Sequence, residues 1–271
     1  MNYITLDKEI KRIMDIDEEI FEAFKDSTQY IIALKTKSTI PKTSELFWMY
    51  IISSNFIKEA IFECSIKDNI YSASILFRSL IEHYLRFNYM YFKYSLSKED
   101  SVSEHYLTVL QISEYVSKAK SINNAISVSN FKKYDKKIIW DEIREKFPSL
   151  NKKENDVLEQ YLREFDIKKI IAFINNLLKN NDSDILETKF LTDTILEYSE
   201  LSSFVHGGIY AFQRSIDFGN KSKREKEFIR ISSVSLQIAS SIKLFSYLIF
   251  LNFHEGFKNI YLQTEPLIKK I

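Results

Sequence analysis

Four side chains able to bind anions or move protons lie close together in one stretch of the sequence. Arg78, Glu82, His83 and Arg86 fall within the segment Tyr71–Tyr94, whose other residues are mainly apolar or aromatic. On a helix, Arg78, Glu82 and Arg86 share one face, because each is four residues from the next. A guanidinium held by a carboxylate presents a fork of N–H donors that suits a phosphate. The spacing is therefore typical of an anion site, and also of a solvated ion pair, which the apolar neighbours disfavour.

A second polar set lies far along the chain, near the end of another predicted helix. Tyr198, Ser202 and Val205 recur at helical spacing, so we expect a continuous face toward the first helix. His206 ends this helix, and the glycine pair at 207–208 lets the backbone turn sharply and leaves the ring room to meet a ligand. An alternative is that His206 is simply an imidazolium favoured by the negative end of the helix dipole.

Arg78 and His83 are separated by four residues, and this pattern resembles the HEPN superfamily, whose ribonucleases carry an arginine, four to six residues, and a histidine. The resemblance implies metal-independent RNA cleavage, usually completed across a dimer. The family's histidine helps the ribose 2′-hydroxyl attack the adjacent phosphate, and its arginine steadies the phosphate charge. Five positions along a regular helix place two side chains about 140° apart. Arg78 and His83 thus converge only if the helix is distorted or a second chain supplies one of them; otherwise His83 is a core or interface histidine.

The combination of RSLIE in the first segment with YSELSSFVHG in the second resembles bacterial helical proteins of uncharacterised function, related to the HEPN and abortive-infection helical domains. The resemblance implies one polar site between the two helices, in which His206 or His83 acts as general acid/base and Arg78 binds the scissile phosphate. The implied catalytic residues are Arg78, His206, His83 and Glu82, and the implied substrate-binding residues are Tyr198, Ser202 and Arg86.

The composition predicts an all-α, multi-helix bundle. The chain has only 4 glycines and 3 prolines in 271 residues, too few for sheets with their turns or for glycine-rich phosphate loops. We expect one helical domain over 1–271 that is HEPN-like, with a more polar helical insertion at about 121–184. Within it, Ser121–Lys137 is polar and irregular and is predicted to be a long loop. Asp68 or Asn69 is expected to cap the helix that contains Arg78, and Thr43 or Ser44 the helix before it.

Charge and motifs exclude several classes of function. The 38 basic and 37 acidic residues balance, so no global field attracts nucleic acid. One cysteine, Cys64, allows no internal disulfide, and no HExxH or Cys/His cluster predicts a metal site. No Walker A or GxGxxG motif occurs, so no cofactor is expected. The apolar window Ile238–Phe253 contains Lys243 and is short for a membrane span. No signal peptide is visible, and we expect a cytoplasmic protein that does not bind membranes.

Two functions follow from these patterns. The first is a metal-independent ribonuclease, or effector, of a bacterial stress, toxin or phage-defence module, acting on RNA as a homodimer or with a partner protein from its operon. The second is a non-catalytic helical interaction or regulatory subunit, in which the Arg–Glu–His set is a buried network that fixes the register of the helices. Arg78 and His206 in an open cleft would favour the first function, and a sealed, fully paired arrangement the second.

Overall fold

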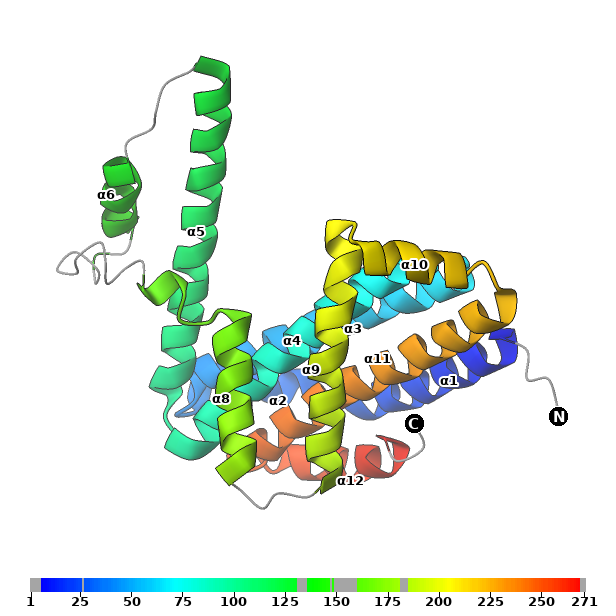
Figure 1. Ribbon diagram of the computed structural model, residues 1–271. Coiled ribbons are helices and arrows are strands. Elements are labelled where there is room, and N and C mark those ends of the chain that lie inside the picture. The colour runs from blue at the N-terminus through cyan, green and yellow to red at the C-terminus, as the bar shows by residue number, and fades with distance from the viewer. Residues whose placement is uncertain are drawn as a thin grey trace.

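The chain folds as an all-α bundle in a computed structural model (Figure 1). The structure describes residues 6–25, 27–130, 136–146, 148, 160–180 and 185–268. In chain order the helices are α1 (Leu6–Phe24), α2 (Ser27–Lys37), α3 (Pro41–Ile66), α4 (Ile70–Ser97), α5 (Asp100–Asn130), α6 (Lys136–Lys146), α8 (Ile167–Asn180), α9 (Ile185–His206), α10 (Ile209–Asp217), α11 (Lys221–Phe250) and α12 (Gly256–Ile268). No strand occurs among the described residues, and the predicted all-α multi-helix fold is confirmed.

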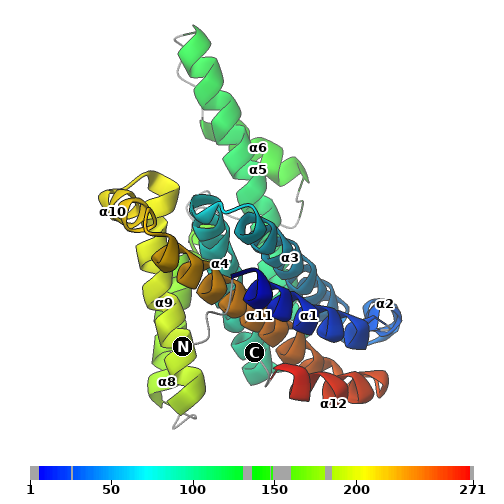
Figure 2. The ribbon, with the colours of Figure 1, turned by 90° about the vertical axis from the view of Figure 1, so that its right-hand side faces the viewer.

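Helix α4 is the centre of the bundle, and it contains the whole predicted segment Tyr71–Tyr94. It packs against α3, α5, α8, α9 and α11, and Figure 2 shows α9 and α3 on opposite sides of it. Phe77, Leu80, Ile81 and Leu85 are fully buried. A helix that is apolar on most of its surface is stable only when other helices cover it, which explains its central position.

The ends of α4 and α9 follow local sequence signals. The Asn69 side chain accepts a hydrogen bond from the Ser72 backbone N–H at 3.1 Å, so the predicted N-cap is confirmed. Helix α9 ends at His206, where Gly207 has a φ of 64°. The Gly208 N–H then donates to the Ser203 carbonyl at 2.9 Å, as expected where a glycine ends a helix.

The start of α3 differs from the sequence prediction. Neither Thr43 nor Ser44 is its N-cap; Ile40 precedes the helix without a side-chain cap, and Pro41 occupies the first turn. The carboxylate of Asp100, the first residue of α5, accepts from the backbone N–H groups of Lys42 at 3.1 Å and Thr43 at 2.7 Å. A negative charge at a helix N-terminus is stabilising. The cap is therefore supplied by a residue distant in sequence.

Helix α5 extends beyond the rest of the bundle (Figure 1). The prediction of an irregular loop over Ser121–Lys137 was wrong for its first part, because α5 continues to Asn130, and for its last two residues, where α6 begins at Lys136; positions 131–135 lie outside the described residues. The extension contains neither glycine nor proline, the two residues that most disfavour a helix interior. A separate small core joins it to α6, formed by Ile112, Val116, Trp140 and Ile143.

Helix α8 also lies within the range predicted as an insertion, but it packs on α4. Its Ile170 and Ile174 belong to the main core.

Helix α11 is the one described helix that is long and apolar enough to cross a membrane by length and composition. In its most apolar window, 61% of the residues are buried in the bundle, where the helix packs against α1, α3, α4 and α12. The apolar side chains of α11 are thus mostly part of the core of the bundle.

Candidate functional site

The two polar segments meet where α4 and α9 pack against each other. Tyr71 near the start of α4 donates from its hydroxyl to the Phe204 carbonyl near the end of α9, at 2.8 Å. Further along α4, Tyr84 packs edge-on against Phe190 near the start of α9, with ring centroids 5.8 Å apart. The helices are therefore antiparallel, and the residues between these contacts face each other.

Arg78 is the residue of α4 with the most contacts across this junction. Its Nε donates to Ser202 Oγ at 3.3 Å, its Nη2 to the Tyr198 hydroxyl at 2.8 Å, and its Nη1 to Glu82 Oε2 at 3.3 Å. The guanidinium carbon also lies 4.6 Å from the centre of the Tyr198 ring. Of the five N–H donors of the guanidinium, the described residues occupy three, which leaves two for a ligand. The Arg78 side chain is 17% exposed, so solvent reaches part of it.

Glu82 joins two guanidinium groups. Its Oε2 pairs with Arg78, and its Oε1 accepts from Arg86 Nε at 3.1 Å and Nη2 at 2.9 Å. Burial alone would raise the pKa of Glu82, but the hydrogen bonds from Arg86 and the charges of both arginines outweigh it and lower the pKa below its ordinary value. Two positive charges share one negative charge, so the cluster keeps a net positive charge.

Arg86 links the cluster to the segment before α8. Its Nη1 donates to the Phe165 carbonyl at 3.0 Å. Burial would lower the pKa of Arg86, but Tyr106 and Glu82 raise it, so the guanidinium stays charged. The Phe165 carbonyl was not among the predicted site residues, because no local signal in the sequence connects it with α4.

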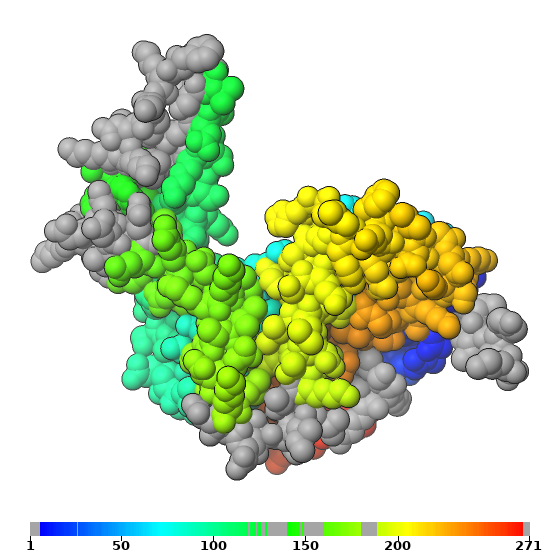
Figure 3. Space-filling view, viewed as in Figure 1, coloured from blue at the N-terminus to red at the C-terminus, as the bar shows by residue number. Residues whose placement is uncertain are grey.

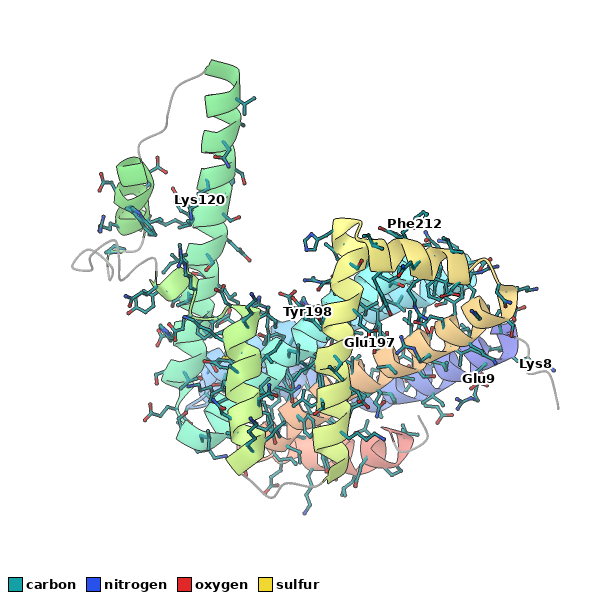
Figure 4. All side chains as sticks on the ribbon, viewed as in Figure 1. Lys8, Glu9, Lys120, Glu197, Tyr198 and Phe212 are labelled. Atoms are coloured by element: carbon teal, nitrogen blue, oxygen red, sulfur yellow. The ribbon has the colours of Figure 1, made fainter. Side chains whose placement is uncertain are left out.

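Tyr198 and Ser202 are positioned as expected, both half-buried on the face of α9 toward α4. The Tyr198 hydroxyl is 3.3 Å from Glu82 Oε2 and donates to it. Burial, reinforced by the charge of Glu82, raises the pKa of Tyr198 above its ordinary value, so the phenol remains protonated at neutral pH. In Figure 4, Tyr198 lies on the opposite side of α9 from Glu197.

His83 is not part of this cluster. Its Nδ1 is 3.1 Å from the Ser79 carbonyl, and because that oxygen only accepts, Nδ1 carries the proton. The ring packs edge-on against Tyr50 of α3, with centroids 6.3 Å apart. Burial lowers the pKa of His83, so the ring is neutral at neutral pH. Regular helix geometry directs His83 toward α3 and Arg78 toward α9, and the two side chains do not converge within one chain.

His206 lies on the exposed end of α9, one helical turn beyond Ser202. Its ring has no hydrogen-bond partner within the described part of the chain. The surface is hollowed between α5 and the corner formed by α9 and α10, and α4 lies at the bottom of this hollow (Figure 3). Of the two candidate histidines, His206 is the one next to the α9 residue that Arg78 contacts.

The fold and this cluster define the chain as a helical bundle with a partly exposed guanidinium–carboxylate site between two antiparallel helices. Among the described residues, no group of three or more His, Cys, Asp or Glu side chains is placed to hold a metal ion. Comparisons with protein-family models, with curated proteins and with solved structures find no match to this chain.

Proposed function

We propose that the chain is a HEPN-like, metal-independent ribonuclease, or an RNA-directed effector, of a bacterial stress or phage-defence module. The observation that supports the proposal is the position of His206. It is exposed, has no partner among the described residues, and lies one turn from Ser202, whose hydroxyl accepts from Arg78. An imidazole can transfer the proton, and a partly exposed guanidinium can stabilise the phosphate charge, in phosphodiester cleavage without a metal. The defence context, the cytoplasmic location, and a homodimer or operon partner come from the resemblance alone.

In this proposal, each side chain has a defined task. His206 takes the proton of a ribose 2′-hydroxyl, whose oxygen forms a bond with the adjacent phosphorus. The bond from phosphorus to the 5′ oxygen breaks, a water gives its proton to that oxygen, and the hydroxide that remains takes the proton from His206. Arg78 binds the phosphate through its two unused N–H donors, and Glu82 holds Arg78 in place. The products are a 2′,3′-cyclic phosphate and a 5′-hydroxyl.

The experiment compares cleavage of total RNA by the wild type and by two variants, His206→Gln and Arg78→Lys, with a chelator present throughout. We expect both variants to lose cleavage while keeping the wild-type circular dichroism spectrum. His105→Gln is the matched control, since His105 is an exposed histidine on α5, paired with Glu164. The RNA ends should carry cyclic phosphates, and DNA of the same sequence should stay intact. Absent cleavage, cleavage stopped by the chelator, or full activity in His206→Gln would contradict the proposal.

The second candidate function is a non-catalytic interaction subunit, and two observations favour it. Three of the donors of Arg78 are already used within the chain, as a structural network requires. Helix α10 also exposes an apolar face, with Ile209 78%, Phe212 68% and Ile216 65% exposed, and Figure 4 shows Phe212 pointing away from the bundle. Large apolar side chains grouped on a surface often mark an interaction site. Light scattering of wild type and Phe212→Glu tests self-association: a smaller mass in the variant, together with no RNA cleavage by the wild type, supports this function over the first.

A further inference from the structure

A large cavity lies between α4, α8, α9 and α11, apart from the Arg78 cluster. Its volume is about 850 Å³, within the range of small-molecule sites. Helices α8 and α9 both pack on α4 and lie side by side in front of α11 (Figure 1). Aromatic side chains from three of the helices line it: Tyr84, Tyr91 and Phe92 from α4, Phe190 from α9, and Phe245 from α11.

An asparagine in the wall of the cavity has a polar atom that bonds to no described residue. Asn88 is only 4% exposed, and its Nδ2 donates to the Tyr84 carbonyl at 2.8 Å. Because a carbonyl only accepts, this bond fixes the orientation of the amide. The amide oxygen has no partner among the described residues. This oxygen is not among the fully buried side-chain atoms that lack a partner, so solvent reaches it, and a ligand N–H or O–H in the cavity can bond to it in place of water.

Two more polar side chains line the cavity from α11. Gln237 and Ser241 are half-buried and four residues apart, so they project from one face of the helix. No partner within the described residues bonds to either side chain. With Asn88, they present an acceptor, an amide and a hydroxyl toward the same space.

The charges around the cavity select a neutral ligand. Among the described residues, Lys189 and Asp193 are the charged ones in its lining; both belong to α9 and are exposed, and their charges cancel. A charged group deep in the cavity would lose its hydration without gaining a counter-ion. The aromatic walls favour a flat ring, and carboxamide side chains such as those of Asn and Gln match the adjacent donor and acceptor of a nucleobase.

We propose that this cavity is a binding site for a neutral, planar heteroaromatic compound of the nucleoside class. The ring packs between the aromatic walls, a ring N–H or amino group donates to the Asn88 amide oxygen, and Gln237 and Ser241 bond the remaining polar edge. Arg78 lies outside the cavity, so binding does not depend on the proposed ribonuclease activity.

Isothermal titration of the full chain with adenosine, guanosine, cytidine and uridine, each separately, tests the proposal. We expect one or more nucleosides to bind with one-to-one stoichiometry and to raise the melting temperature. Dodecanoate serves as the aliphatic comparison, because its chain has no flat ring and no amide edge. Failure of all four nucleosides to bind at millimolar concentration would overturn the proposal, and so would displacement of a bound nucleoside by stoichiometric dodecanoate.

Three variants locate the site. Gln237→Leu and Asn88→Leu each remove a polar partner at similar size, and we expect each to weaken binding about tenfold, the value of one good hydrogen bond. Ser241→Trp fills the cavity and should abolish binding even if Asn88→Leu fails to fold. The control is Gln111→Leu, at an exposed position on α5. Unchanged affinity in Gln237→Leu and Ser241→Trp would place the nucleoside elsewhere and refute the assignment.

Discussion

Lys243 of α11 is a buried amine with no carboxylate in ion-pair contact among the described residues. Its titration tests whether the core holds this side chain in the neutral form. The side chain is 3% exposed, and its Nζ lies 5.3 Å from the centre of the Phe24 ring. Its charged neighbours are Lys58 and Glu59 of α3 and Asp17 of α1. Lys58 and Asp17 form an ion pair with each other. Burial, with the positive charge of Lys58, lowers the pKa of Lys243 from 10.5 to about 7.

The difference between the folded and the unfolded pKa of Lys243 sets both the sign and the size of its effect on the free energy of unfolding. Between pH 7 and 10 the unfolded chain holds the Lys243 proton and the folded chain does not, so the free energy of unfolding rises with pH. The full difference of about 3.5 pKa units corresponds to about 5 kcal/mol. At pH 7 the buried lysine lowers stability by about 4 kcal/mol, and at pH 9 by about 2 kcal/mol.

Lys243→Met removes the titrating group and keeps an apolar chain of similar length. Urea unfolding of wild type and variant, followed by circular dichroism at pH 7, 8 and 9, measures the difference. We expect the variant to be more stable at pH 7, and this advantage to shrink by about 1 kcal/mol per pH unit. Lys226→Met, at an exposed position on the same helix, should leave the wild-type pH dependence unchanged. Parallel pH curves for wild type and Lys243→Met would refute the assignment of a neutral buried amine.

Three further substitutions test the site and the helix ends, each by urea unfolding. Glu82→Gln leaves the guanidiniums of Arg78 and Arg86 without a counter-charge and should cost about 1–2 kcal/mol at pH 7, given the partial exposure of the cluster. Because the folded-state pKa of Glu82 is lowered, its contribution is present above pH 4.5 and is lost as the pH falls through the folded pKa, where variant and wild type should converge. A constant difference down to pH 2 would contradict the ion-pair explanation. Gly207→Ala places a side chain at a φ of 64° and should cost about 1 kcal/mol, although the added Cβ meets open space; a neutral result would show that the turn relaxes. Asn69→Ala removes the N-cap bond to the backbone N–H three residues later and should cost about 1 kcal/mol, and no loss would mean that water replaces the cap.

Local rules account for the part of the site that was predictable from the sequence. The pairing of Glu82 with Arg78 and Arg86 follows from the four-residue spacing alone. The caps at Asn69 and Gly207 follow from residue type and the neighbouring apolar pattern. Each of these contacts lies within one helix or at its end, where the sequence determines the geometry.

Contacts made between helices were not predictable in the same way. Asp100 caps a helix that begins far upstream, and the Phe165 carbonyl accepts from Arg86, although neither has a local signal. The cavity depends on the space left where four helices meet, which no single helix encodes. The sequence holds one feature that is consistent with the cavity. Gln237 and Ser241, four residues apart, put two polar side chains on one face of the largely buried helix α11.

Helix geometry also decides which histidine can act with Arg78. On one regular helix, a separation of five residues directs His83 toward Tyr50 of α3, while its Nδ1 donates to the Ser79 carbonyl one turn back on α4. Ser202, which accepts from Arg78, lies one turn before His206 on α9, so the proposed function assigns proton transfer to His206. In that proposal the imidazole and the guanidinium come from two helices, and not from the arginine–histidine spacing on α4. A double-mutant cycle of Arg78→Lys and His206→Gln on RNA cleavage measures this coupling: non-additive losses are expected of groups that act on one phosphate, and additive losses would separate them.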